Sequence, residues 1–281
     1  LPGREKLGLI TEVPLPDDGG GVALFLENFG DRNFIRVQTV GRDRPQDPAV
    51  PLVVMHPDPL RAALLIAEGG GEGVTAHLRE DRRHITDRDI DRLKEECPLP
   101  LNFEMAATHE MLGIARRVRP HAVCLVPEKR EERTTESGLD VARVETSLRP
   151  IVEGLGDAGC RVSLFVDPEP QQLEAAKRLG APVVELHTGT YCEATGDAQR
   201  GELQRLQKAA AFAHSMGIEC HAGHGLDFRT VGSVSAIPEV VELNIGHFLI
   251  GEAIFAGLVP TIRQMRLAMD EARRTLGGTA G

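Results

Sequence analysis

The sequence is poor in aromatic residues and has no tryptophan. Its 281 residues include nine Phe and one Tyr, which is 4% aromatic residues in total. Proteins that bind single-stranded nucleic acid stack the bases on aromatic side chains, so this composition argues against such a partner. Basic charge is also in deficit, with 32 Lys and Arg against 42 Asp and Glu and a formal net charge of −10. Because phosphate backbones are bound by basic surfaces, we predict no nucleic-acid partner.

Long apolar runs and paired cysteines are missing as well. No stretch approaches the roughly 18 apolar residues that span a bilayer, and the first residues lack the apolar core of a secretory signal. The five cysteines form no Cys-x-x-Cys pair, and their number is odd. This usage is typical of a reducing compartment, where cysteines act as small buried apolar residues. The sequence thus predicts a cytoplasmic protein with no membrane partner.

Short apolar segments rich in β-branched residues recur from residue 73 onward. They occupy residues 73–77, 99–104, 121–126, 161–167, 182–187, 217–221 and 240–245. Segments with helical spacing lie between them, such as 169–179 and 199–216, each followed by Gly. Seven β-then-α units in succession favour a parallel sheet with crossover helices. With this chain length they predict an α/β fold, a single (β/α)8 TIM barrel, although alternation alone also permits a doubly wound open sheet.

An eighth strand must precede residue 58 if the barrel closes. Residues 33–40 are the best candidate, and residues 51–55 compete with them. Turn-forming composition at 14–21 sets the beginning of the chain apart from the later repeating units. We therefore interpret residues 1–30 as an appended N-terminal arm and residues 31–281 as the barrel.

Polar residues fall at the carboxyl ends of the predicted strands. These residues are His77, Glu104, Glu185, His187, His221 and Asn244. In a parallel barrel such ends meet at one face, where the active sites of this fold are built. A single residue of this kind often only solvates a loop entrance, but six together favour an active site. Glu104 and Glu185 end apolar strands, so burial would raise their pKa values and suit them to proton transfer, unless they only pair with a nearby Arg.

Two further features indicate a phosphorylated ligand. Residues 77–84 bring two imidazoles and three guanidinium groups to the end of one strand, and Arg binds phosphate bidentately while His transfers protons near neutral pH. The Gly-containing segments 222–226 and 244–247 follow the last two strands, the usual phosphate site of this barrel. No His-x-His or His-Glu-x-x-His spacing occurs, so we predict no metal.

Eight motifs, in order along the chain, carry a resemblance to a known family. They are Pro-Asp-Pro at 57–59, HLREDRRHI at 77–85, NFEM at 102–105, LVPEKR at 125–130, TTESGLDV at 134–141, ELHTG at 185–189, AGHGL at 222–226 and ELNIGH at 242–247. From about Pro57 to Arg273 the chain resembles the pyridoxine 5′-phosphate synthases, the ring-closing transferases of vitamin B6 biosynthesis. The resemblance implies a (β/α)8 barrel assembled as a homo-octamer. It also implies condensation of 3-amino-2-oxopropyl phosphate with 1-deoxy-D-xylulose 5-phosphate to pyridoxine 5′-phosphate, phosphate and water, with no cofactor.

The resemblance also implies roles for individual residues. His77, Glu104 and His224 match residues that shuttle protons, and Glu185 matches one that stabilises the reacting species. The remaining matches hold substrate phosphates: Arg79, His84 and Thr134 for the deoxyxylulose phosphate, and Gly225, Gly246 and His247 for the amino ketone. Asn33 and Arg44 match substrate-binding residues of the family's first strand.

The first-strand motif departs from the family pattern. Ile35 and Arg36 stand where the family has an Asp-His pair, and an insertion covers residues 45–56. An aliphatic side chain and a fixed cation cannot replace a carboxylate and an imidazole, so a non-enzymatic or impaired phosphosugar-binding paralogue is the alternative. A third possibility is another phosphosugar barrel enzyme, such as an isomerase or an aldolase. A Schiff-base aldolase would need a strand-end Lys, and only Lys129 comes near.

Overall fold

The chain forms two compact units in a computed structural model. The structure describes residues 12–14, 21–29, 32–40, 58–132 and 138–277. One unit is Leu1–Pro57 and the other is Asp58–Gly281. Each unit has a sheet of its own.

The N-terminal unit contains a three-stranded antiparallel sheet. Its strands are β1 (Glu12–Pro14), β2 (Gly21–Phe29) and β3 (Arg32–Val40), in the order β1-β2-β3. The β2–β3 register runs from Gly21 opposite Val40 to Phe29 opposite Arg32. Only Gly30 and Asp31 separate β2 from β3 in the sequence, and a two-residue connection that begins with Gly favours a hairpin.

The predicted strand 33–40 is therefore present, but its assignment to the barrel sheet was wrong. It pairs with its immediate neighbour in the sequence, because closing a two-residue loop costs far less entropy than pairing across the chain. The alternative segment 51–55 lies outside the described residues. The division into residues 1–30 and 31–281 stays a prediction.

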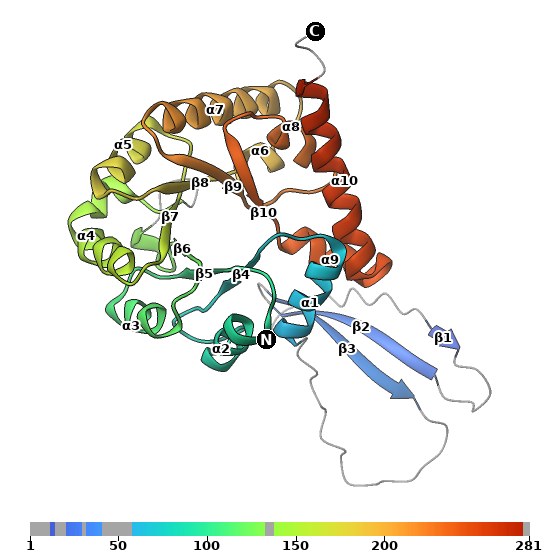
Figure 1. Cartoon of the computed structure of the whole chain (residues 1–281). Helices are drawn as coiled ribbons and strands as arrows, with labels where there is room; N and C mark the ends of the chain where they lie inside the picture. Colours follow the sequence, from blue (N-terminus) through green and yellow to red (C-terminus); the bar gives the residue numbers. More distant parts are fainter. Residues whose placement is uncertain (1–11, 15–20, 30–31, 41–57, 133–137, 278–281) are drawn as a thin grey trace, which may run out of the picture. The chain divides into compact units, whose positions relative to one another are not determined.

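The second unit contains a seven-stranded parallel sheet. Its strands are β4 (Val74–His77), β5 (Leu101–Met105), β6 (Ala122–Leu125), β7 (Arg161–Val166), β8 (Val183–His187), β9 (Glu219–Gly223) and β10 (Val240–Asn244). They are hydrogen-bonded in sequence order, and every neighbouring pair is parallel. All seven predicted segments are confirmed as strands. The sheet curls around a centre with its helices outside, which confirms the TIM-barrel fold class over an open sheet (Figure 1).

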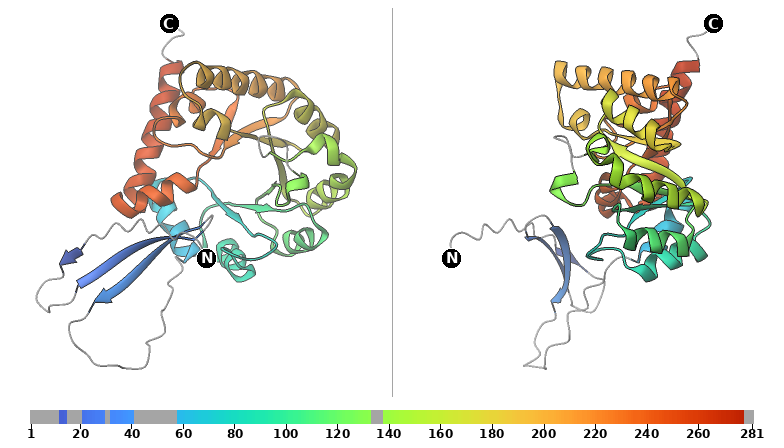
Figure 2. Two further views of the ribbon diagram at one scale, coloured as in Figure 1. Left: turned by 180° about the vertical axis from the view of Figure 1, so that it is seen from behind. Right: turned by 90° about the vertical axis from the view of Figure 1, so that its left-hand side faces the viewer.

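Helices connect the strands on the outside of the curled sheet (Figure 2). They are α1 (Pro59–Gly69), α2 (Asp87–Glu96), α3 (His109–Val118), η1 (Arg130–Glu132), α4 (Val141–Asp157), α5 (Pro170–Leu179), α6 (Gly189–Glu193), α7 (Gly196–Ser215), α8 (Val231–Ser235), α9 (His247–Ala256) and α10 (Leu258–Gly277). The predicted helices 169–179 and 199–216 are confirmed, the second beginning earlier at Gly196. Gly180 ends α5 with φ +76°, the left-handed conformation that Gly adopts without strain.

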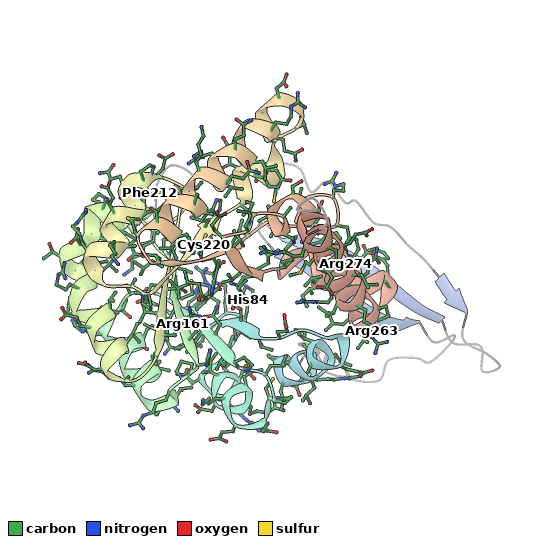
Figure 3. The ribbon with its side chains drawn as sticks, turned by 45° about the horizontal axis from the view of Figure 1, so that its top comes forward. His84, Arg161, Phe212, Cys220, Arg263 and Arg274 are labelled. Carbon is green, nitrogen blue, oxygen red and sulfur yellow. The ribbon has the colours of Figure 1, made fainter. Side chains whose placement is uncertain are left out.

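Alternation along each strand separates an apolar face from a polar one. Residues such as Phe103, Leu164 and Leu186 are buried between the sheet and the helices, in the layer that also holds Phe212 of α7 and Cys220 of β9 (Figure 3). The residues next to them in sequence, such as Glu104, Ser163 and Glu185, face the other way. Barrels of this class usually fill that inner face with Val, Ile and Leu, whereas here it carries polar groups.

The start of α2 offers a first test of the fold. Thr86 and Asp89 form a capping box, in which each side chain accepts from the other residue's backbone N–H, at 3.4 Å to Thr86 Oγ1 and 2.9 Å to Asp89 Oδ2. We expect Thr86→Ala to lower the free energy of unfolding by about 1 kcal/mol, because one helix N–H loses its acceptor. Urea denaturation measures this, and Thr86→Ser should recover most of the loss. Equal stability of the Ala variant would contradict the assignment.

Candidate active site

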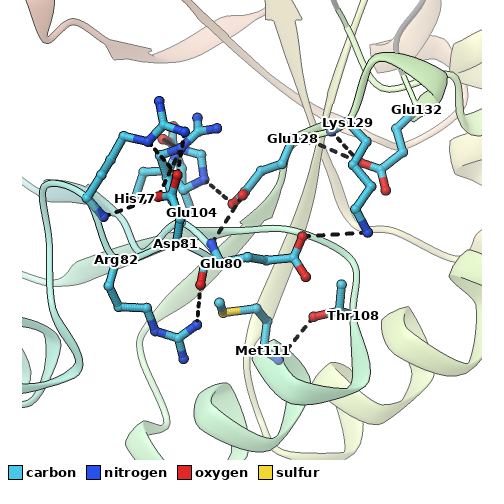
Figure 4. Close-up of polar contacts among 12 residues, drawn as sticks. His77, Glu80, Asp81, Arg82, Glu104, Thr108, Met111, Glu128, Lys129 and Glu132 are labelled. Carbon is cyan, nitrogen blue, oxygen red and sulfur yellow. Dashed lines mark hydrogen bonds and ion pairs between the residues drawn. The ribbon is translucent and has the colours of Figure 1, made fainter. Parts of the chain in front are cut away.

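A histidine between two carboxylates lies at the ends of β4, β5 and β6 (Figure 4). His77 ends β4 and is in register with Glu104 on β5, and its Nδ1 lies 3.9 Å from Glu104 Oε2. On the other side, His77 Nε2 lies 2.9 Å from Oε1 of Glu128, which follows β6. The second oxygen of Glu128 accepts the backbone N–H of Glu80 at 3.1 Å. Glu128 is thereby held against the imidazole, with only 6% of its side chain exposed.

The surroundings shift the pKa values of both His77 and Glu104. Burial lowers the pKa of His77, although hydrogen bonding and charge from Glu128 oppose the shift. Burial also raises the pKa of Glu104 to about 7. A neutral imidazole beside a carboxyl of this pKa can both accept and donate a proton near pH 7, which is what general acid–base catalysis requires.

Glu185 lies deeper, on β8, and is fully buried. Its Oε2 accepts from Nδ2 of Asn244 at 2.9 Å and from the Cys124 thiol at 3.7 Å. Burial, with the nearby charge of Glu104, raises the pKa of Glu185 well above its usual range. Burial thus favours the protonated carboxyl, which can donate a hydrogen bond to a developing oxyanion. A Cβ at Gly223 would overlap Glu185 Oε1, so β9 needs Gly there to admit the carboxyl.

A chain of side-chain hydrogen bonds holds Asn244 in place. Thr75 donates its hydroxyl to Asn244 Oδ1 at 2.7 Å, and Asn102 Nδ2 donates to the Thr75 hydroxyl at 3.3 Å. In the described part of the chain, β4 and β10 are the two end strands of the sheet. The Thr75–Asn244 contact joins them across the inside, and it orients the Asn244 amide so that its NH₂ group faces Glu185.

His221 occupies a different environment in the middle of β9. Its Nε2 lies 2.8 Å from Glu219 Oε1 and its Nδ1 lies 3.3 Å from Glu242 Oε1, while Arg161 Nη2 lies 2.6 Å from Glu219 Oε2. Burial lowers the pKa of His221, but hydrogen bonds and charges from Glu242 and Glu219 outweigh this and raise it. The imidazolium is thus neutralised on both sides, which indicates an ion cluster inside the sheet rather than a proton-transfer group.

His224 follows β9 where the chain turns. Its φ is +80°, a left-handed conformation that is uncommon for a residue with a Cβ. Burial lowers its pKa; the charge of Glu193 opposes this shift and that of His247 adds to it. Next to it Gly225 is also left-handed, with φ +83°.

The N-terminus of α9 lies beyond the last strand. Gly246 is its N-cap and His247 its first residue. Gly246 and His247 are both exposed, and a Cβ built on Gly246 would meet nothing within 4 Å. Such groups, with the positive end of the helix dipole, attract phosphate.

The other predicted site residues are placed less closely together. Arg79 lies in the loop after β4, with Nε 3.8 Å from Asp81 Oδ1, and His84 is exposed in the same loop (Figure 3). Asn33 belongs to β3 of the N-terminal unit, as do the two residues that depart from the family motif. Arg44 and Thr134 lie outside the described residues.

Glu128 is the group that sequence reasoning missed. It follows a buried strand, as the other strand-end carboxylates do, and it stands in the motif at 125–130. In that motif the sequence indicates only Lys129, as the lysine that a Schiff-base aldolase would need. Lys129 is exposed and lies 3.7 Å from Glu80 Oε2, whereas Schiff-base lysines are activated in desolvated pockets.

Within the described residues, no three or more His, Cys, Asp or Glu side chains are arranged to hold a metal ion. None of the described helices is both long enough and apolar enough to cross a membrane.

The family model described as pyridoxal phosphate biosynthesis protein PdxJ matches residues 53–271. The chain belongs to the PdxJ family. A pyridoxine 5′-phosphate synthase of Rhodospirillum rubrum is 63% identical to this PdxJ-family chain over 226 residues, 80% of the chain and 90% of the relative. That of Roseobacter denitrificans is 62% identical over 222 residues, 78% of the chain and 89% of the relative. The resemblance predicted from the motifs is therefore confirmed.

Solved structures similar to this PdxJ-family chain support the fold alone. Phosphoribosyl anthranilate isomerase from Thermus thermophilus has a TM-score of 0.51 at 15% identity, covering 76% of the chain and 95% of that structure. KGPDC from Streptococcus mutans has a TM-score of 0.55 at 9% identity, covering 76% and 92%.

Proposed function

We propose that this chain is a pyridoxine 5′-phosphate synthase. It condenses 3-amino-2-oxopropyl phosphate with 1-deoxy-D-xylulose 5-phosphate to give pyridoxine 5′-phosphate, phosphate and water. The observation that carries the proposal is His77 between Glu104 and Glu128, at the carboxyl ends of parallel strands, in a chain of the PdxJ family. It is supported by the position of the imidazole and of Glu104, whose pKa is raised to about 7, at the face where barrel enzymes bind substrate.

The reaction needs repeated proton transfers, which this set of side chains supplies. The amine attacks a ketone and water leaves, and enolisation, loss of phosphate and ring closure each require a positioned acid or base. We assign the proton transfers to His77, Glu104 and His224. Neutral Glu185 donates a hydrogen bond to oxygen atoms on which negative charge develops.

The phosphate groups are assigned to two places. Gly225, Gly246 and His247 hold the phosphate of the amino ketone, which the exposed N-terminus of α9 supports. The deoxyxylulose phosphate is assigned to the family-matched residues Arg79, His84 and Thr134, while Asn33 and Arg44 are proposed as substrate-binding residues with no phosphate assigned to them. Arg79 and His84 follow β4 in the same loop, directly after His77.

We further propose a cytoplasmic homo-oligomer, a homo-octamer as in the family resemblance. Ile250, Ile254 and Phe255 of α9 are 53%, 55% and 84% exposed in the single chain, and large exposed apolar side chains gathered on one helix are typical of an interface. Light scattering on the purified protein measures the mass of the assembly, and a monomer at micromolar concentration would contradict this part of the proposal.

The decisive test of the function is turnover by the purified full chain. Incubation with both substrates should yield pyridoxine 5′-phosphate, identified by mass, together with an equal amount of inorganic phosphate. Calorimetric titration with each substrate separates binding from catalysis. Binding without product would instead favour the non-catalytic phosphosugar-binding alternative that the altered first-strand motif raises.

Glu128→Gln tests the carboxylate behind His77. We expect kcat to fall about 10-fold with little change in KM, because the imidazolium loses a charge-assisted hydrogen bond at 2.9 Å. The acid limb of the pH–rate profile should move to lower pH, since the pKa of His77 falls when the anionic partner is removed. Glu174→Gln, an exposed carboxylate on α5, is the control and should behave as wild type. An unchanged profile in Glu128→Gln would remove Glu128 from the mechanism.

A further inference from the structure

The segment His187-Thr188-Gly189 has no part in the assigned chemistry, yet it is buried beside the site. It ends β8 and begins α6, and His187 and Thr188 are 7% and 0% exposed. His187 and Thr188 contact the same neighbour, His224, which follows the adjacent strand β9, and a Cβ added to Gly189 would crowd the His187 and His224 rings. These contacts join the loop after β8 to the loop after β9, and the proposed site depends on both loops.

The ring of His187 lies flat against that of His224. The ring centroids are 4.9 Å apart and the planes differ by 25°, which is a stacked arrangement. His187 also meets Phe165 of β7 edge to face, at 5.1 Å and 73°, and the Phe165 ring lies 6.3 Å from that of His224. His187 is thus held against Phe165 and presents a fixed surface to His224.

Thr188 holds the backbone at the same turn. Its hydroxyl lies 2.8 Å from the carbonyl oxygen of Gly223 and 2.6 Å from that of His224, and its backbone N–H donates to Gly223 at 2.9 Å. These carbonyls flank the point where β9 ends and His224 adopts φ +80°. A left-handed residue with a Cβ persists only where its surroundings over-determine it, and the Thr188 hydroxyl is such a restraint.

Gly189 leaves the space that the two imidazoles fill. A Cβ on it would lie 2.5 Å from Cε1 of His187 and 3.3 Å from Cδ2 of His224. Real Cβ atoms essentially never approach another atom as closely as 2.5 Å, so any other residue here would displace the His187 ring from its stacking position.

We propose that His187, Thr188 and Gly189 form a clamp that positions the His224 imidazole for proton transfer, with His187 fixing the ring and Thr188 fixing the backbone. The three are positioning residues, because they act through His224. The role of His224 itself rests on the proposed synthase function. The clamp also affects the position of Gly225, which is assigned to the phosphate of the amino ketone, because Gly225 follows His224 directly in the chain.

Substitutions of His187 and of Thr188 are expected to cause different kinetic defects. His187→Ala removes the stacking surface, so kcat should fall about 10-fold with KM nearly unchanged, and His187→Phe should restore most of the rate because it keeps a flat ring. Thr188→Val keeps the volume but loses both carbonyl contacts. It should lower kcat about 10-fold and also raise KM, because Gly225 moves with the backbone, and Thr188→Ser should restore both.

A matched control separates positioning from simple loss of stability. Thr261 is also fully buried and donates its hydroxyl to a backbone carbonyl, Gly257, at 2.8 Å. Thr261→Val therefore removes the same kind of contact from α10. It should lower the melting temperature about as much as Thr188→Val does, without moving kcat, KM or the pH profile.

A second readout does not depend on turnover. The ¹⁵N resonances of His224, assigned by their loss in His224→Gln, report its titration in the folded protein. The titrating or charged groups around it are Glu193, His247 and His187, and burial holds its pKa low. His187→Ala admits water, so the pKa of His224 should rise toward about 6.5, and His187→Phe should leave it low.

The outcomes distinguish a failure of the clamp proposal from a failure of the proposed synthase function. If wild-type protein makes no pyridoxine 5′-phosphate, the synthase proposal fails, while the His224 titration still tests the clamp. If wild type is active but His187→Ala and Thr188→Val lose no more rate than Thr261→Val and leave the His224 titration unchanged, the clamp is overturned.

Discussion

Replacing His77 with alanine is expected to abolish formation of pyridoxine 5′-phosphate while leaving the barrel folded. The imidazole lies between Glu104 and Glu128, 3.9 Å from one carboxyl and 2.9 Å from the other, so its removal takes away the group that can pass a proton between them. Loss of a general acid–base group costs typically about 10²- to 10⁴-fold in rate, and we expect a loss at the upper end. Product formation over hours, followed by mass, measures it.

The fold should tolerate this change because the site is not part of the apolar core. The His77 side chain is 24% exposed and projects from the end of β4, away from the layer between sheet and helices. The thermal transition of His77→Ala should therefore stay cooperative and within a few degrees of wild type. A collapsed transition would instead identify His77 as a structural histidine, and retained turnover would sink its catalytic assignment.

Glu104→Gln is expected to make the protein more stable above neutral pH and to inactivate it. Burial raises the pKa of Glu104 from 4.5 to about 7, so the folded state favours the protonated acid. Between these two values the folded protein holds a proton that the unfolded chain has lost. Stability from this group is thus complete below about pH 4.5 and is lost as the pH rises to about 7. The difference between a pKa of 4.5 and one of about 7 corresponds to about 3 kcal/mol in the free energy of unfolding.

Glutamine resembles the protonated acid at every pH and escapes this loss. The variant should match wild type near pH 4.5 and exceed its free energy of unfolding by up to about 3 kcal/mol at pH 8, as measured by urea denaturation. The catalytic rate should fall by about 10²-fold or more, because an amide cannot take up a proton. Glu174→Gln, on the exposed face of α5, serves as the control. A stability difference that stays constant from pH 5 to pH 8 would contradict a raised pKa.

Much of the barrel could be predicted from sequence because its signals are local. Most of the seven strands are short runs rich in apolar residues, and helices such as α5 end at a Gly that takes the left-handed conformation. The strand-end positions of His77 and Glu104 also followed from the pattern, since parallel strands bring their carboxyl ends to one face. The assignment of residues 33–40 to the barrel sheet was wrong. Their pattern fits a strand in either sheet, and β/α alternation does not determine which strand they pair with.

What could not be predicted depends on side-chain direction and distance. Glu128 is three residues beyond the end of β6, and only the folded loop turns its carboxylate onto His77. His221 has the same position in the sequence pattern as His77, yet its neighbours on β9 and β10 neutralise it on both sides. The sequence of residues 187–189 does not show that His187 and Thr188 contact His224.

The sequence by itself determined the order of strands and helices, the family and the chemical character of the site. These follow from hydrophobic periodicity and from motifs, which are properties of residues near one another in the chain. Only the tertiary structure shows which histidine lies between two carboxyls, which carboxyls have raised pKa values and which side chains pack against His224. Those properties depend on desolvation and on charges a few ångströms away, and the residues responsible come from different strands.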